Sequence, residues 1–217
     1  CERGDTLGAR RLLDDTVRRI RGLSMDHLLP TAMRVVLHVA TLRANVSDAA
    51  IAMAGLQGQN QRDPEIPATL VRWWRTRGDL QRALTVPPPE RHTYGYCLWQ
   101  VECARAALCA GDDTTATSLA NGGLNTATTL QFSELGLYAR LVLGVVEDEE
   151  EQVWAATEAR ASRSQNIELY LGALEMGARR AARRNDDIGS RIQWRTLRAR
   201  AQELGYQPGI EEAAGWL

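Results

Sequence analysis

Apolar side chains recur every three to four residues along most of this chain, which is the pattern of amphipathic helices. The clearest stripe lies within Tyr94–Ala110 and consists of Cys97, Leu98, Val101, Ala104 and Leu108, with the stem of Arg105 among them. Similar stripes predict helices over Leu12–Leu23, Leu29–Leu42, Leu135–Val146, Ile167–Ala178 and Ile188–Leu204. Strand signals are scarce, because β-branched runs are short and no hairpin turn joins two alternating segments. The pattern therefore predicts an all-α fold.

Two breaker-rich segments interrupt the helical pattern. Pro87–Pro89 must end any helix that begins at Asp79, because proline lacks an N–H donor and clashes with the preceding turn. A second loop is predicted at Gln57–Pro67, where Gly, Asn, Asp and Pro residues cluster.

The predicted turns recur at a regular interval. Turn-forming aspartates lie at Asp48, Asp79, Asp112, Asp148 and Asp186, with 31 to 38 residues between neighbours. Two of these turns share the string Gly-Asp-x-x-x-Ala, from Gly78 to Ala83 and from Gly111 to Ala116. In such a string glycine closes one helix in a left-handed conformation, aspartate caps the next helix, and the small alanine allows close helix packing.

This interval and this string resemble the tetratricopeptide repeat, whose period is about 34 residues. Ala104 and Gly123 also fall on small-residue positions of that repeat. The resemblance covers residues 45–204, with departures at the acidic run Glu147–Glu151 and at Ser190, where alanine is usual. It implies a single domain over residues 1–217, cut from a larger protein, in which antiparallel helix hairpins stack as a right-handed solenoid. A single non-repeating helical bundle would give a similar alternation of helices and turns.

Irregular repeats of this kind are similar to the helical sensor and scaffold arms of large bacterial transcription regulators, including the maltose-regulator type. The likeness implies a cytoplasmic module that binds a protein, a peptide or a small acidic ligand, without catalysis and without a cofactor.

All 26 basic residues are arginine, which, with the abundant alanine, indicates a GC-rich bacterial genome. A net charge of −1 argues against nucleic-acid or membrane binding through bulk charge, and no apolar run reaches the roughly 20 residues of a membrane span.

Aromatic and cationic residues gather in two neighbouring predicted helices. Trp73 and Trp74 point about 100° apart on a helix, so we expect one of them to face a concave surface. Together with nearby residues they form the predicted recognition surface, which consists of Arg72, Trp73, Trp74, Arg75, Tyr94, Tyr96 and Trp99. The other tryptophans are expected in the packing between helices.

Catalytic and metal-binding motifs are weak. Cys97, Cys103 and Cys109 lie six residues apart, so on a helix they point about 120° from one another and are expected to be buried thiols that share no metal. The three histidines are dispersed and form no known ligand spacing. We therefore expect neither a metal nor a catalytic residue.

Two other functions are weighed as alternatives. Asp14-Asp15 and Asp186-Asp187 faintly resemble the magnesium motifs of helical terpene cyclases, which would make the chain a helical enzyme or small-molecule-binding domain. Arg18 and Arg19 follow the first pair, and Trp194 stands where the second motif needs a glutamate, so helix caps and solvated faces are the simpler interpretation. The C-terminal third is rich in arginine, which suggests phosphate contacts; arginines also commonly pair with carboxylates or pack along apolar surface. Those arginines are Arg179, Arg180, Arg183, Arg184, Arg191, Arg195, Arg198 and Arg200.

Overall fold

The computed structural model describes residues 6–57 and 63–217. Within these ranges all regular structure is helical and no strand occurs, so the all-α prediction is confirmed. A short 3-10 helix, η1 (Asp26–Leu28), precedes α2. The α-helices are α1 (Thr6–Gly22), α2 (Leu29–Leu42), α3 (Val46–Leu56), α4 (Ile66–Thr76), α5 (Leu80–Thr85), α6 (Tyr94–Cys109), α7 (Asp113–Leu130), α8 (Ser133–Val146), α9 (Glu151–Ser162), α10 (Ile167–Arg183), α11 (Asp187–Leu204) and α12 (Gln207–Trp216).

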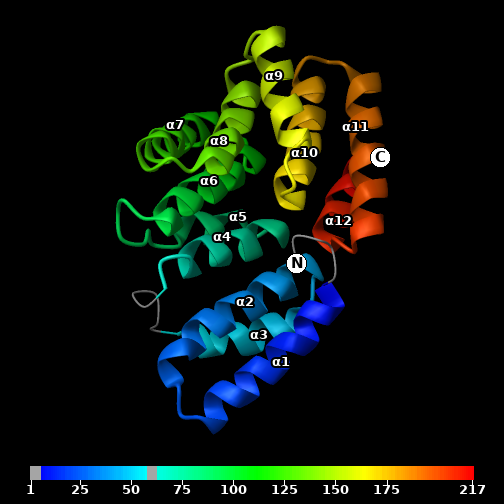
Figure 1. Cartoon of the computed structure of the whole chain (residues 1–217). Helices are drawn as coiled ribbons and strands as arrows, with labels where there is room; N and C mark the ends of the chain where they lie inside the picture. The colour runs from blue at the N-terminus through cyan, green and yellow to red at the C-terminus, as the bar shows by residue number, and fades with distance from the viewer. Residues whose placement is uncertain (1–5, 58–62) are drawn as a thin grey trace.

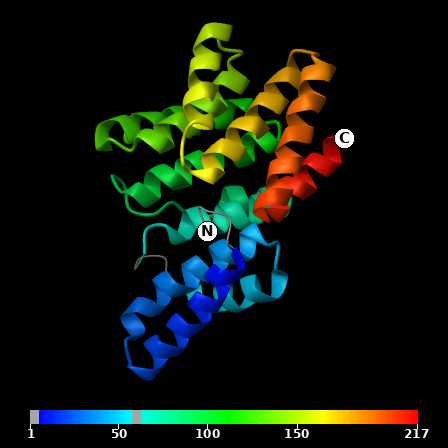
Figure 2. The ribbon, with the colours of Figure 1, turned by 45° about the vertical axis from the view of Figure 1, so that its right-hand side comes forward.

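Five even-numbered helices, α2, α4, α6, α8 and α10, form the inside of the molecule. Each of α2, α4, α6 and α8 packs against the next even-numbered helix, and each even-numbered helix from α2 to α10 also packs against the odd-numbered helix that follows it. Figure 1 shows α2, α4, α6, α8 and α10 one after another through the molecule; we call these five the inner helices. The C-terminal helix α12 contacts α2, so the chain returns to its N-terminal part (Figure 2). This curvature brings helices together that are distant in sequence.

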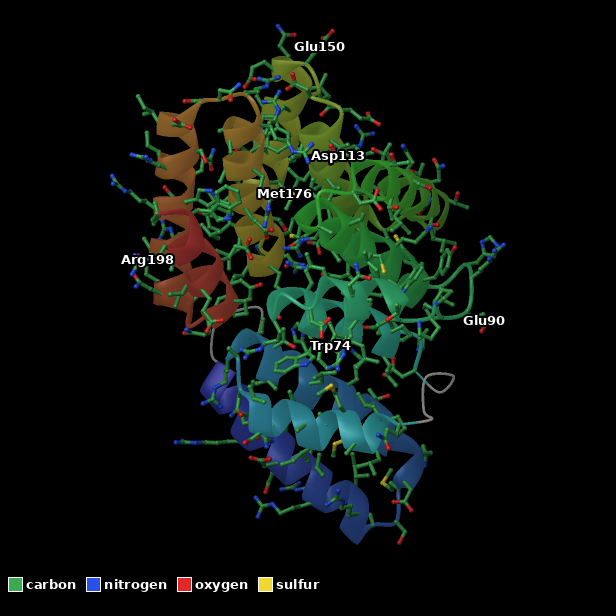
Figure 3. The ribbon with its side chains drawn as sticks, turned by 180° about the vertical axis from the view of Figure 1, so that it is seen from behind. Trp74, Glu90, Asp113, Glu150, Met176 and Arg198 are labelled. Atoms are coloured by element: carbon green, nitrogen blue, oxygen red, sulfur yellow. The ribbon has the colours of Figure 1, made fainter. Side chains whose placement is uncertain are left out.

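Apolar packing is divided among several clusters along this arrangement. One cluster lies between α2, α3 and α4 and contains Leu37 and Trp73. The largest spans α6 to α10 and includes Leu141 and Met176, and another joins α10, α11 and α12 around Trp194. Trp74, at the boundary of α4 with α2, and Met176, far from it, mark two of these regions in Figure 3. Each helix therefore buries its apolar face mainly against helices that are close to it in the chain.

The two Gly-Asp turns adopt the predicted geometry. Gly78 and Gly111 have φ angles of 75° and 76°, which a residue with a Cβ adopts only with strain. Asp79 and Asp112 then cap α5 and α7. Their side chains accept hydrogen bonds from the backbone N–H groups of Arg82 and Thr115, at 3.2 Å and 3.0 Å. Ala83 and Ala116 are fully buried, so small side chains lie where the helices pack together.

Two turn predictions are wrong in detail. Asp48 is not the turn residue, because Asn45 caps α3 and Asp48 lies in the first turn of that helix. The Asn45 side chain accepts a hydrogen bond from the Asp48 N–H at 3.1 Å, so the helix begins directly after Asn45. Pro67 belongs to the first turn of α4 and not to a loop, because the first helical turn needs no proline N–H. Residues 58–62 of the predicted loop lie outside the described residues.

Other local predictions are confirmed. Helix α5 ends at Thr85, ahead of Pro87–Pro89, and the acidic run reaches the start of α9 at Glu151, where negative charge favours the helix dipole. Cys97 and Cys103 are buried free thiols as predicted, whereas the free thiol Cys109 is only partly buried, because it lies at the end of α6. Over the described ranges, no helix has the length and apolarity needed to cross a membrane.

Candidate functional site

Four inner helices meet in a group of ionisable side chains that are partly or fully buried. The Arg72 guanidinium on α4 lies 2.8 Å from Glu102 on α6 and 2.6 Å from Glu168 on α10. His38 on α2 completes the group, with its Nε2 atom 3.1 Å from Glu168 and its Nδ1 atom 3.2 Å from Arg72. Arg72 and Glu168 lie 96 positions apart in the sequence, and His38 and Glu168 lie still further apart, so these contacts link the first and the last of the inner helices.

The group extends along α6 and α10. Glu102 is 1% exposed and also lies 3.3 Å from Arg75 and 3.5 Å from Arg105. Arg105 in turn pairs with Glu175 at 2.7 Å, and Glu175 pairs with Arg179 at 3.2 Å. Arg179 also contacts Glu212 on α12. We call the whole set the central charge cluster; it consists of His38, Arg72, Arg75, Glu102, Arg105, Glu168, Glu175, Arg179 and Glu212.

The contacts of His38 define its protonation pattern. Arginine has only donors, so the His38 Nδ1 atom must accept the Arg72 N–H. The Nε2 atom then carries the hydrogen that it donates to the Glu168 carboxylate. The arrangement therefore fits a neutral imidazole with its hydrogen on Nε2.

Mutual pairing keeps the cluster charged despite its burial. Burial by itself would raise the pKa of Glu102, but the guanidinium groups of Arg72, Arg105 and Arg75 outweigh it and hold that pKa at about 2. Glu168 behaves in the same way. Burial opposes its ionisation, whereas Arg72 and His38 favour it, and the net effect lowers its pKa. Carboxylates held in this form are weak proton acceptors, because their basicity is low.

A hollow of about 220 Å³ opens beside this cluster, and all five inner helices contribute side chains to its lining. Two further lining residues, Glu65 and Asn166, are the N-caps of α4 and α10. We call it the central pocket. Its lining residues are Arg34, His38, Glu65, Thr69, Arg72, Tyr94, Leu98, Val101, Glu102, Glu134, Leu135, Tyr138, Asn166 and Glu168.

The more exposed part of the pocket carries two further carboxylates. Glu65 lies 2.9 Å from Arg34, and Arg34 also pairs with Asp63 at 2.8 Å. Glu134 is exposed and has neutral partners, since it accepts hydrogen bonds from the Ser164 hydroxyl at 3.1 Å and the Asn166 amide at 3.0 Å.

Tyr94 forms an aromatic wall of the same pocket. Its ring packs edge-on against Phe132, with 5.2 Å between ring centroids, and the residue is 44% exposed. Partial burial and the nearby carboxylates of Glu65, Glu134 and Glu168 raise the pKa of the Tyr94 hydroxyl, although Arg72 opposes them. The hydroxyl therefore stays protonated and can donate or accept a hydrogen bond.

Local sequence explains how Tyr94 reaches this position. Thr93 caps α6 by accepting the Tyr96 N–H at 3.0 Å, so the helix begins at Tyr94. Gly95 allows the start of α6 to lie directly against the chain before α4, because a Cβ there would come within 2.0 Å of the Pro64 carbonyl oxygen. This close approach places Tyr94 beside Glu65.

The structure brings only part of the predicted recognition surface together. Arg72 and Tyr94 line the central pocket, whereas Arg75 is buried in the central charge cluster. Arg72 and Arg75 were expected to attract an acidic ligand, but both pair with Glu102, so neither offers an unpaired positive charge.

The predicted aromatic residues lie mostly elsewhere. Trp73 is 3% exposed in the core, and Trp74 packs between two apolar clusters under the Arg82 guanidinium, 4.9 Å from its ring. Neither tryptophan is among the residues that line the pocket, because both indoles are needed to fill gaps between α4 and its neighbours. Tyr96 stacks on Trp99, whose indole N–H donates to the Val86 carbonyl at 3.1 Å. These side chains secure the proline-rich connection after α5.

Several pocket residues were missed by the sequence analysis. A usable signal exists for two of them, since His38 and Glu102 interrupt the apolar sequences Leu37–Val39 and Val101–Cys103 inside helices with buried residues on most sides. A buried ionisable residue in such a helix requires a partner from another helix. No comparable signal marks Arg34, Glu65, Glu134, Tyr138 or Glu168.

The residues of the alternative functions have local structural roles. Asp14 pairs with Arg10, and Asp15 pairs with Arg18 at 2.9 Å. Asp186 caps α11 by accepting the Gly189 N–H at 2.9 Å.

Among the C-terminal arginines, Arg179, Arg180, Arg183 and Arg184 all pair with carboxylates of other helices or connections. Arg191, Arg195 and Arg198 are exposed on α11, and no ion-pair partner for them occurs within the described residues. Arg198 points away from the body of the protein in Figure 3.

Burial also reduces the reactivity of the thiols. It raises the pKa of Cys97 to about 11 and, with a smaller contribution from Glu102, that of Cys103 to about 12. At neutral pH both remain thiols.

Comparisons with protein-family models, with curated proteins and with solved structures found no significant match to this chain.

Proposed function

We propose that this chain is a non-catalytic binding module, in which antiparallel helix hairpins stack as a right-handed tetratricopeptide-like solenoid. Its role would be protein interaction or ligand sensing within a cytoplasmic bacterial transcription regulator. The observation that carries the binding role is the central pocket, to which successive inner helices each contribute side chains. Helical-repeat proteins typically bind partners on the surface formed by such successive helices.

Local geometry supports the repeat interpretation. Two turns combine a left-handed glycine, an aspartate cap and a buried alanine, at Gly78 and Gly111. The inner helices contact one another in chain order, as stacked hairpins require. The regulator assignment rests on the sequence resemblance alone.

The electrostatics of the pocket favour recognition over proton transfer. Arg72, Glu102 and Glu168 hold one another in their charged forms, so none of them is poised to exchange a proton near neutral pH. A fixed arrangement of charges and apolar side chains is instead suited to select a ligand by complementarity.

A ligand screen tests the binding role. The intact chain would be heated with amino acids, nucleotides, sugars and short peptides, and compared with a Leu98→Trp variant that fills the pocket. A genuine ligand at 100 times its Kd adds about 2.7 kcal/mol of stability, which is a shift of several degrees. Val153→Trp, at a partly exposed site on α9, is the matched control and should respond as the native chain does.

Tyr94→Ala provides a second pocket variant if Leu98→Trp perturbs folding, which far-UV circular dichroism would reveal. The proposal fails if no compound distinguishes the native chain and Val153→Trp from the two pocket variants.

A second candidate function is nucleic-acid contact through the outer face of α11. It is favoured by the exposed guanidinium groups of Arg191, Arg195 and Arg198, which have no ion-pair partner in residues 6–57 and 63–217. Binding of fluorescent DNA at increasing salt would test it, with an Arg191→Ala, Arg195→Ala double variant for comparison. Absence of binding, or equal binding by the variant, would reject this candidate.

A further inference from the structure

The charge balance of the central pocket is negative. Among its lining residues the four carboxylates of Glu65, Glu102, Glu134 and Glu168 face two guanidinium groups, those of Arg34 and Arg72, while His38 is neutral, which leaves a formal charge of −2. The rest of the ion-pair network that continues from these residues does not change this result, because it adds three acidic and three basic groups. The acidic ones are Asp63, Glu175 and Glu212, and the basic ones are Arg75, Arg105 and Arg179.

The excess negative charge lies at the exposed side of the pocket. Deep in the pocket Glu102 contacts three arginines, and Glu168 contacts Arg72 and His38. Among the described residues Glu134, by contrast, has only the neutral Ser164 and Asn166 as hydrogen-bond partners. Within the same residues Glu65 pairs with one guanidinium, that of Arg34, and shares it with Asp63. Glu65 and Glu134 are therefore the carboxylates with capacity for a further cation.

The remaining surface suits the apolar part of a long basic side chain. Leu98 and Leu135 provide an apolar lining, and the Tyr94 ring provides an aromatic face. Aromatic faces attract ammonium and guanidinium groups, and the methylene stem of such a side chain packs well on apolar surface. A volume of about 220 Å³ is below the roughly 300 to 1,000 Å³ of typical pockets for drug-sized ligands, which favours a single extended side chain.

We infer that the central pocket binds a basic side chain, that of arginine or lysine, whose cation lies between Glu65, Glu134 and Tyr94. This inference rests on the proposed function, since it names the ligand chemistry of the same pocket. An acidic ligand would add to the existing negative charge and is disfavoured. The raised pKa of the Tyr94 hydroxyl is consistent with the negative surroundings, since burial and then Glu65, Glu134 and Glu168 contribute to it.

Matched probes test this inference directly. The intact chain would be titrated with a fluorescent glycine-serine nonapeptide that carries one central arginine, and with the same peptide carrying citrulline or glutamate. Citrulline has nearly the shape of arginine without its charge. We expect the arginine peptide to bind about tenfold or more tightly than the citrulline peptide, and salt to weaken this preference. N-acetyl-argininamide and N-acetyl-lysinamide would be titrated in parallel. Tighter binding of the peptide would indicate that the cation belongs to a polypeptide, and tighter binding of a capped residue would indicate a free amino acid.

Charge-neutral variants locate the interaction. Glu134→Gln should lower the affinity for the arginine peptide several-fold, because an exposed carboxylate is lost without a change in shape. Glu90→Gln is the matched control, since Glu90 is exposed on the proline-rich connection and projects away from the helices in Figure 3. It changes the net charge equally and should leave the affinity unchanged.

The outcomes separate the two levels of the argument. Equal binding of the arginine and citrulline peptides, preference for the glutamate peptide, or loss of affinity by Glu90→Gln equal to that of Glu134→Gln would overturn the inference. Failure of every basic probe would also overturn it. The proposed function survives each of these results if the screen with Leu98→Trp finds another pocket ligand, and it fails separately if that screen finds none.

Discussion

The central charge cluster and the outer face of α11 both contain several arginines but place them in opposite environments. Arg75 and Arg105 are 6% and 4% exposed and lie against Glu102 and Glu175. Arg191, Arg195 and Arg198 extend into solvent, without a carboxylate partner in the part of the chain that the structure describes. The same residue type therefore fixes the relative position of helices in one region and supplies only solvated charge in the other.

The difference shows that environment, and not arginine content, determines what these residues contribute. A buried guanidinium without its carboxylate would retain the cost of desolvation, so each member of the central charge cluster depends on the others. An exposed guanidinium remains hydrated whether or not a partner is near. Substitutions in the two regions should consequently differ greatly in effect.

Removal of Glu102 should have the largest effect. Glu102→Ala leaves Arg72, Arg75 and Arg105 without their shared carboxylate, and we expect a loss of about 3 to 5 kcal/mol in the free energy of unfolding. Urea denaturation followed by circular dichroism measures this quantity. Glu203→Ala removes an exposed carboxylate that pairs with Arg200 on α11 and should leave the unfolding midpoint unchanged. Equal effects of the two substitutions would contradict the comparison.

Acid should weaken the buried region next most strongly. The pKa of Glu102 is lowered from 4.5 to about 2 in the folded chain, so its contribution to stability is complete above about pH 4.5 and is lost as the pH falls toward 2. The loss from this group is on the order of 3 kcal/mol. Urea midpoints from pH 6 to pH 2.5 would reveal it, and a Glu203→Gln variant should show the native dependence. A native profile that is flat over this range would rule out the buried ionised state.

The Tyr138 hydroxyl should make a smaller contribution. It donates a hydrogen bond to the Glu168 backbone carbonyl, and the residue is 9% exposed. Tyr138→Phe should therefore lower the free energy of unfolding by about 1 kcal/mol. Tyr96→Phe removes a hydroxyl for which no hydrogen bond occurs within the described residues, so its denaturation midpoint should match that of the native chain. A larger loss in Tyr96→Phe would reverse this expectation.

The outer face should tolerate substitution best. An Arg191→Ala, Arg195→Ala double variant should keep its melting temperature within about 2 °C of the native value, because the two guanidinium groups are exposed and form no ion pair with any residue that the structure describes. Differential scanning calorimetry provides the measurement. A decrease of 5 °C or more would mean that α11 uses these arginines structurally.

The local sequence was sufficient for several of the helices. Apolar spacing predicted α2 with its bounds, Leu29–Leu42, and Pro87–Pro89 predicted the end of α5. Gly111 and Asp112 encode a turn through their own backbone preferences and a hydrogen bond between near neighbours. Such features depend on interactions within a few residues, so a pattern in the sequence records them.

The site was predictable only in part. Arg72 and Tyr94 were identified by their aromatic and cationic surroundings, but the role expected of Trp73 required knowledge of which helix face is covered by α2 and α3. The carboxylates Glu134 and Glu168 carried no distinguishing local pattern. Their importance arises from their neighbours in space.

Short-range periodicity, capping and backbone hydrogen bonds make many of the helices readable from local sequence, and for α2 they give both ends. The meeting of His38, Arg72 and Glu168 is a property of the fold, since that contact depends on how α2, α4 and α10 are oriented relative to one another. A helix pattern specifies the direction of a side chain from its own axis, and the partner it reaches is fixed by the packing of the remaining helices.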